Sequence, residues 1–133
     1  PRDPRRARLA GRGRHRRAGG GPLSRFRRIL VAFDGSDPAR HALDAALDLA
    51  LDLDARVEVL AVSGHLPRYA ATRGEVDDAL EERDAFFAGV LADARTLAAE
   101  RDVAITTTFK PGHPAEEIVR YGQESGADLI VLG

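Results

Sequence analysis

The sequence predicts an α/β fold, a parallel sheet with helices on both faces. Short apolar runs recur at residues 29–33, 56–62 and 127–132, with amphipathic stretches between them. Apart from the first half of residues 56–62, these runs alternate little with polar residues, which is typical of strands buried on both faces of a parallel sheet. The predicted order is β-α-β-α-β-α-β, and this order favours a covered sheet with right-handed crossovers.

The length and composition indicate one small globular domain. The chain has 133 residues, of which 44% are hydrophobic and 31% charged, a balance typical of globular proteins. It contains no cysteine, which excludes both a disulfide framework and a thiolate metal site. No apolar run approaches the roughly 18 residues that a membrane-spanning helix needs. We therefore expect no membrane partner.

Charge is divided unevenly along the chain. Residues 1–28 carry eleven arginines and one acidic residue, whereas residues 29–133 carry twenty acidic and nine basic side chains. Residues 1–25 have too few apolar side chains to form a core, so we expect a disordered Arg/Gly-rich arm before a domain at residues 26–133. The arm could bind nucleic acid, or it could be a translated leader or linker. Because aromatic residues are not interleaved with the arginines, we favour the leader or linker and expect no nucleic-acid partner.

The first predicted helix follows the strand at residues 29–33. Pro38 lies at or near its first position, and Ser36 or Asp37 can cap its N-terminus. Apolar residues recur at helical spacing on one face. The opposite face carries aspartates at four-residue spacing, which could be read as metal ligands: Asp44, Asp48 and Asp52. Since no other ligands converge on this row, we interpret it as a solvated face.

The other strands and helices follow in the second half of the chain. A long helix is predicted over residues 75–101, with one apolar stripe that starts at Val76. Gly89 interrupts this helix, and we interpret it as a point of close packing. Residues 103–109 alternate apolar residues with polar ones, which indicates an edge strand, and residues 110–114 predict a turn. A short helix then leads into the last strand.

Asp34 is the strongest candidate for a functional residue. It ends the first strand, at a polar turn before a helix, which is where α/β folds bind ligands. A carboxylate here could accept hydrogen bonds from a ribose or a base, or bind a metal. It could equally be a turn residue that hydrogen-bonds the backbone of Gly35 and Ser36. The residues alone leave both interpretations open.

The sequence offers no set of catalytic residues. It lacks the glycine-rich dinucleotide and P-loop motifs, and Asp34 and Asp37 are three residues apart, where a dehalogenase-type phosphatase needs a separation of two. His65 and His113 follow strand ends and could approach the same edge of the sheet. We interpret them as ordinary loop histidines, since no histidine pair has metal-ligand spacing. The prediction is a binding protein without a metal site and without enzyme activity.

Several segments, in order along the chain, resemble the universal stress protein family. The stretch Arg28-Ile29-Leu30-Val31-Ala32-Phe33-Asp34-Gly35-Ser36 resembles the family's first strand and its V-A-x-D-x-S ending. The Ala- and Leu-rich helix after it and the strand at residues 59–62 also fit. The family's G-x-P…I…A-D-L-I-V-x-G segment is matched by Gly112-His113-Pro114, Ile118 and residues 127–133. The resemblance covers about residues 27–133.

The resemblance implies a Rossmann-like α/β/α sandwich whose five parallel strands have the order 3-2-1-4-5. ATP-binding members hold adenine and ribose near the residues that match Ala32, Asp34 and Val62. They hold the phosphates on a glycine loop whose first glycine matches Gly133. By this resemblance we expect a cytoplasmic stress-response protein that binds ATP and, when complete, forms a homodimer.

The match to this phosphate loop stops at Gly133. In the family the rest of the loop, the last helix and the fifth strand follow that position, so we interpret the chain as truncated at its C-terminus. Backbone N–H groups of the loop supply most of the attraction for phosphate. We therefore expect the chain as written to bind ATP poorly. The alternative is a module of the same fold that acts by dimerisation and binds no nucleotide.

Overall fold

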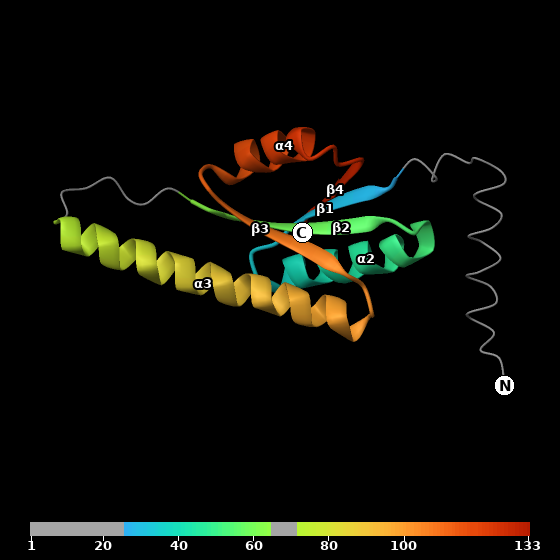
Figure 1. Ribbon diagram of the computed structural model, residues 1–133, viewed down its shortest axis with the longest axis horizontal. Coiled ribbons are helices and arrows are strands. Elements are labelled where there is room, and N and C mark those ends of the chain that lie inside the picture. The colour runs from blue at the N-terminus through green and yellow to red at the C-terminus, as the bar shows by residue number, and fades with distance from the viewer. Residues whose placement is uncertain (1–25, 65–71) are drawn as a thin grey trace.

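The computed structural model describes residues 26–64 and 72–133, which form a four-stranded parallel sheet of order β3-β2-β1-β4 (Figure 1). The predicted α/β class is confirmed. The predicted arm at residues 1–25 and His65 lie outside the described residues. The strands are β1 (Arg28–Ala32), β2 (Arg56–Ser63), β3 (Ile105–Pro111) and β4 (Leu129–Val131), and the helices are α2 (Asp37–Leu53), α3 (Arg73–Glu100) and α4 (Pro114–Glu124).

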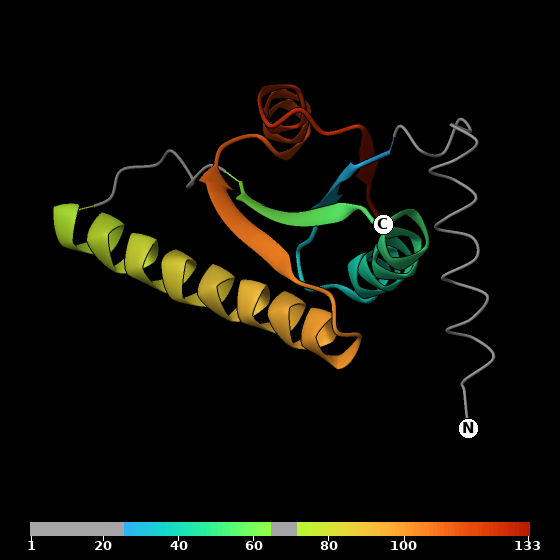
Figure 2. The same cartoon turned by 45° about the vertical axis from the view of Figure 1, so that its right-hand side comes forward.

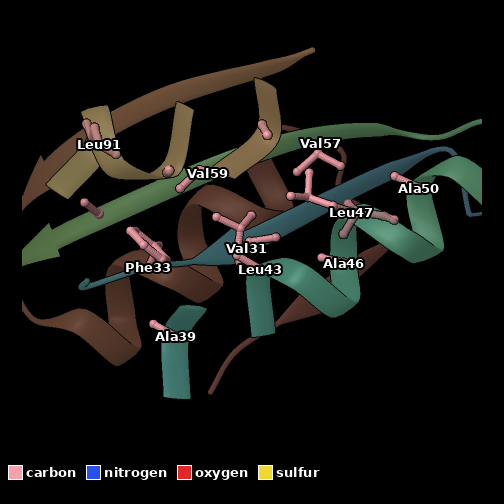
Figure 3. Close-up of a cluster of buried hydrophobic side chains, with 14 of the residues drawn as sticks. Val31, Phe33, Ala39, Leu43, Ala46, Leu47, Ala50, Val57, Val59 and Leu91 are labelled. Atoms are coloured by element: carbon pink, nitrogen blue, oxygen red, sulfur yellow. The ribbon is translucent and has the colours of Figure 1, made fainter. Parts of the chain in front are cut away.

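The helices cover both faces of the sheet, as predicted. α2 and α3 lie on one face and α4 on the other (Figure 2). Every second residue of β1 and β2 points toward α2 and α3, where valines pack against leucines and alanines of the helices (Figure 3). Val31, Val59, Leu43 and Leu47 have no exposed surface there. This core fixes α2 against β1, so the turn that joins them has a rigid base.

α4 is attached to its face of the sheet by both apolar and polar contacts. Gly122 packs where a side chain would meet Ile130 of β4, since an added Cβ would lie 2.7 Å from Ile130 Cδ1. The Tyr121 hydroxyl donates to Glu58 Oε2, and Thr108 Oγ1 donates to the same oxygen at 3.1 Å. Burial, and then the hydrogen bond to Glu58, raise the pKa of Tyr121. Tyr121 therefore stays protonated and keeps donating at neutral pH.

α2 begins as the sequence predicts. Ser36 is the N-cap, its Oγ accepts the Ala39 N–H at 3.3 Å, and a proline occupies the first turn. Two aspartates of the row on its outer face, Asp44 and Asp48, form ion pairs with Arg101, the residue that follows α3. Within the described residues no group of three or more His, Asp or Glu could hold a metal ion.

β3 lies at the sheet edge, as predicted, but two residues later than expected. Val57 pairs with Ile105, and this register runs on until Val62 pairs with Lys110 and Ser63 with Pro111. The predicted turn at Lys110 and Pro111 is therefore wrong. A proline fits here because it is the last residue of an edge strand, where its missing N–H breaks no central ladder.

β4 is shorter than the predicted strand at residues 127–132. Its start is delayed because the Asp128 carboxylate accepts the backbone N–H groups of Arg27 and Arg28, both at 2.9 Å. Its end is also early, since Leu132 is 61% exposed and lies beyond the last paired residue. β4 is the second edge strand of the described sheet.

The N-terminal half of α3 projects beyond the sheet (Figure 1). A capping box between Thr72 and Glu75 stabilises its start. The buried residues of α3 begin only at Val90, whereas Val76 is 39% and Phe86 60% exposed. The predicted apolar stripe from Val76 is therefore buried only in its second half, where the helix crosses β2 and β3.

Gly89 is not a point of close packing, and that interpretation was wrong. A Cβ added there would meet no atom within 4 Å. Since glycine is a poor helix former, we expect Gly89→Ala to raise the free energy of unfolding by up to about 1 kcal/mol, measured by urea denaturation. Gly122→Ala is the control, because its Cβ would meet Ile130, and it should give no gain. A loss of stability in Gly89→Ala would contradict the open surroundings.

None of the helices in the described part of the chain is long and apolar enough to cross a membrane.

Candidate functional site

The candidate site lies at the carboxyl ends of β1 and β4, where open α/β sheets form their ligand crevice. β1 pairs with β2 on one side and with β4 on the other, and all three run parallel. The chain leaves β1 through α2 on one face of the sheet and reaches β4 from α4 on the opposite face. This reversal is the topological switch point of an open α/β sheet, and ligands bind at such points.

Asp34 lies at this edge, two residues after β1. Its side chain is exposed, and Oδ1 accepts the Ser36 N–H at 2.9 Å. Hydrogen bonding by the Ser36 side chain, and then by its backbone N–H, lowers the pKa of Asp34, so the carboxylate is ionised at neutral pH. The turn contact that the sequence left open is thus present, and the ligand role stays a prediction.

The turn after Asp34 is held against α3. Gly35 has a φ of 82°, a conformation that favours glycine, and a Cβ there would lie 3.4 Å from Val90 of α3. Arg40 of α2 donates from Nε to the Gly35 carbonyl at 3.4 Å and from Nη2 to Asp93 of α3 at 2.6 Å. Two helices therefore position the turn that carries Asp34.

Gly133 closes the other side of the crevice. A Cβ added to Gly133 would lie 2.2 Å from the Pro38 carbonyl oxygen and 2.5 Å from its carbonyl carbon. These are backbone atoms of the first turn of α2, so they cannot move aside as a flexible side chain could. With the backbone as it stands, position 133 has no room for a Cβ, because the chain after β4 lies against the helix turn that follows Asp34.

Ala32 and Val62 lie on the α4 side of the same edge. Both are partly buried, and they share the sheet face of Leu30 and Leu60, which have almost no exposed surface. Ala32 is paired with Leu60. Asp34 follows Ala32 by two residues and Val62 follows Leu60 by two residues, so Asp34 and Val62 lie at the same level along the two chains. The carboxyl ends of the strands therefore carry all four predicted site residues: Ala32, Asp34, Val62 and Gly133.

Sequence reasoning missed two residues of this region. Pro38 was expected only to start a helix, and its backbone is what contacts Gly133. Lys110 was expected in a turn, but it pairs with Val62, and its Nζ lies 5.9 Å from the centre of the Tyr121 ring. Continuing the alternation of Thr106 and Thr108 by one step could have found Lys110 on the same face.

His113 lies at the start of α4. It is exposed, and although it occupies the N-cap position of α4 it makes no side-chain capping hydrogen bond. The interpretation of His113 as an ordinary loop residue fits this placement.

Comparisons with known proteins agree on one family. The sequence profile described as the universal stress protein family matches residues 25–133. Universal stress protein YxiE of Bacillus subtilis is 33% identical over 120 residues, covering 81% of this chain and 78% of YxiE. Universal stress protein MJ0531 of Methanocaldococcus jannaschii is 32% identical over 111 residues, with 81% and 64% covered.

Solved structures give the same result. A universal stress protein family member from Burkholderia pseudomallei superposes with a TM-score of 0.66 at 36% identity, covering 85% of this chain and 83% of that one. UspA from Lactobacillus plantarum superposes with a TM-score of 0.67 at 30% identity, with 82% and 77% covered. On the profile match, the sequence identities and the shared fold, the chain belongs to the universal stress protein family.

Proposed function

We propose that the crevice binds an adenine nucleotide, ATP in the first instance, and that the protein acts in the cytoplasm as a stress-response regulator through this binding and not through turnover. The observation that carries the proposal is the contact between Gly133 and the first turn of α2. It gathers a strand-end carboxylate, a glycine and a helix N-terminus at the switch point of the sheet. These are elements that α/β proteins use to hold nucleotides.

Each predicted residue has a distinct part in this proposal. Asp34 is ionised and exposed, so it can accept hydrogen bonds from the ribose hydroxyls. Ala32 and Val62 offer a partly buried apolar surface against which a flat base can pack. Gly133 brings the end of β4 against the first turn of α2, and backbone N–H groups at a helix N-terminus can bind phosphate.

Nucleotides in related structures support the class of ligand. A universal stress protein in complex with cAMP superposes with a TM-score of 0.59, and an Arabidopsis thaliana family member with AMP bound superposes with a TM-score of 0.63. They are 21% and 18% identical to this chain, so their likeness is one of fold. The proposal that this chain binds a nucleotide therefore depends on its own crevice.

Isothermal titration calorimetry with ATP tests the proposal. We expect binding with heat detectable at millimolar nucleotide. Asp34→Ala should reduce the affinity about tenfold, because a hydrogen bond to a charged group contributes about 1.5 kcal/mol or more. The same variant should lower the urea midpoint only slightly, since Asp34 is exposed and its carboxylate contributes one turn hydrogen bond, to the Ser36 N–H.

Asp78→Ala is the matched control. Asp78 is also an exposed aspartate, but it lies on the projecting half of α3. It should bind ATP like the parent chain. Equal affinity in Asp34→Ala and Asp78→Ala would show that Asp34 is only a turn residue, and no heat at millimolar ATP would overturn nucleotide binding.

Self-association is the second candidate function, and the edge of β4 favours it. β4 has a partner strand on one side only within the described sheet, and Leu132 beside it is exposed. An open strand edge with apolar neighbours can pair with another chain. Light scattering as a function of concentration measures this directly, and a monomer at every concentration would remove the dimer from the proposal.

A further inference from the structure

A concave site lies at the amino ends of the strands, at the end of the sheet opposite to the one that carries Asp34. A hollow of about 470 Å³ opens on the α4 face, where β1, β2 and β3 begin and the chain leaves α4. Its volume falls within the roughly 300–1,000 Å³ that small-molecule sites occupy. The polar side chains around it are Arg28, Arg56, Glu58, Thr106 and Ser125.

Two arginines stand side by side at this hollow. Arg28 and Arg56 are register partners on neighbouring parallel strands, and both lie on the sheet face opposite Ile29 and Val57 of the core. Like charges that face each other across two strands destabilise a sheet. Arg28 Nη1 donates to the Ser125 carbonyl at 2.9 Å, whereas the Arg56 guanidinium has no hydrogen bond or ion pair with any described residue.

The carboxylates nearby keep their negative charge but form no ion pair with either guanidinium. Glu58 lines the hollow, but Tyr121 and Thr108 donate to its Oε2. Asp128 accepts the backbone N–H groups of Arg27 and Arg28 through Oδ2 and makes no ion pair with either guanidinium. Arg56 is thus an exposed cation without a protein partner for its guanidinium at the rim of a cavity, and an anion can form charge-assisted hydrogen bonds with it.

The rest of the lining is apolar. Leu30, Ala104 and Ala127 contribute to it on this face of the sheet, and it is also bordered by Ile29, Val57 and Ile105, whose side chains belong to the core face. An inorganic anion would leave this apolar surface exposed to water. A neutral apolar molecule would form no ion pair with Arg28 or Arg56. A molecule with an anionic head and an apolar body satisfies both parts of the site.

We propose that this hollow binds an amphipathic carboxylate. The carboxylate lies at Arg56 and the adjacent Arg28, where a guanidinium can donate two parallel hydrogen bonds to its oxygens. The apolar body lies along the first residues of β2 and β3, below the C-terminal end of α4. This site is separate from the nucleotide crevice, because the two lie at opposite ends of the strands.

The probe is octanoate, used below its micellar concentration and followed by ¹H–¹⁵N NMR of the full chain. Acetate has the same head without the apolar body, and 1-octanol has the body without the charge. We expect saturable shifts for octanoate at residues around Arg56, Thr106 and Ala127, with at least tenfold weaker binding of acetate and octanol. Equal affinity for octanoate and octanol would overturn the role of the arginines.

Two variants separate the head from the body. Arg56→Gln should weaken octanoate about tenfold, whereas the control Arg73→Gln, on the projecting end of α3, should not change it. Ala104→Leu places a larger side chain at an exposed position of the lining and should also weaken octanoate. Octanoate shifts that survive both Arg56→Gln and Ala104→Leu, or that map to the crevice at Asp34, would contradict the proposal whether or not ATP binds.

Discussion

Gly133→Ala is expected to lower the free energy of unfolding by about 1–3 kcal/mol and to weaken ATP binding by tenfold or more. The added methyl would lie 2.2 Å from the Pro38 carbonyl oxygen, and that oxygen belongs to helix backbone. Gly133 is exposed, so the overlap is relieved by a backbone shift at Gly133 or at Pro38, and an overlap of one methyl group costs free energy of this size. The shift would separate the end of β4 from α2 and so widen the crevice. Urea denaturation and calorimetry measure the two effects.

Gly64→Ala is the matched control for this substitution. Gly64 follows β2 near the same edge of the sheet, yet an added Cβ there meets no atom within 4 Å. We expect its stability to change by less than about 0.5 kcal/mol, as for most surface substitutions. If Gly133→Ala behaves like Gly64→Ala in both measurements, the contact with Pro38 does not position the crevice.

Leu47→Ala is expected to lower the free energy of unfolding by about 2–5 kcal/mol, the largest effect of any substitution considered. Leu47 has no exposed surface and lies in the core between α2 and the sheet (Figure 3). Truncation removes its buried methyl groups and leaves a cavity that a packed core fills only in part. The midpoint in urea should fall while the slope of the transition stays the same.

Leu51→Ala provides the comparison one turn further along the same helix. Leu51 is 50% exposed, so the same truncation removes much less buried surface and leaves no enclosed cavity. Its cost should stay below about 1 kcal/mol. Similar losses for Leu47→Ala and Leu51→Ala would mean that α2 does not pack on the sheet through the face described.

Elements with a local signal could be predicted from the sequence. β1 and the start of α2 follow from an unbroken apolar run, a capping serine and a proline, all of which act on their own neighbours. The ends of β3 and β4 could not be predicted in this way. β3 extends to Pro111 because β2 continues beside it, and β4 starts late because Asp128 binds backbone at the start of β1. Both causes involve residues far apart in sequence.

The candidate site divides in the same manner. Asp34 is visible in the sequence because a carboxylate after a buried strand is a local pattern. The lack of room for a Cβ at position 133 depends on the backbone of Pro38, 95 positions earlier. Only the resemblance to a family pointed to Gly133, and no residue pattern gave the physical reason. Gly89 shows the converse error, since its place inside a helix indicated packing that the fold does not supply there.

The hydrogen bonds beneath α4 set the position of this helix along the sheet. Apolar contacts alone tolerate sliding, but the Glu58 carboxylate has donors only while Tyr121 and Thr108 lie beside it. Sliding α4 by one turn, about 5.4 Å, would strip this half-buried carboxylate of the Tyr121 donor, at a cost of about 1–3 kcal/mol. The hydrogen bond between Tyr121 and Glu58 therefore fixes the position of α4 along the sheet. Because α4 leads directly into β4, the same hydrogen bond determines how far Gly133 reaches toward α2.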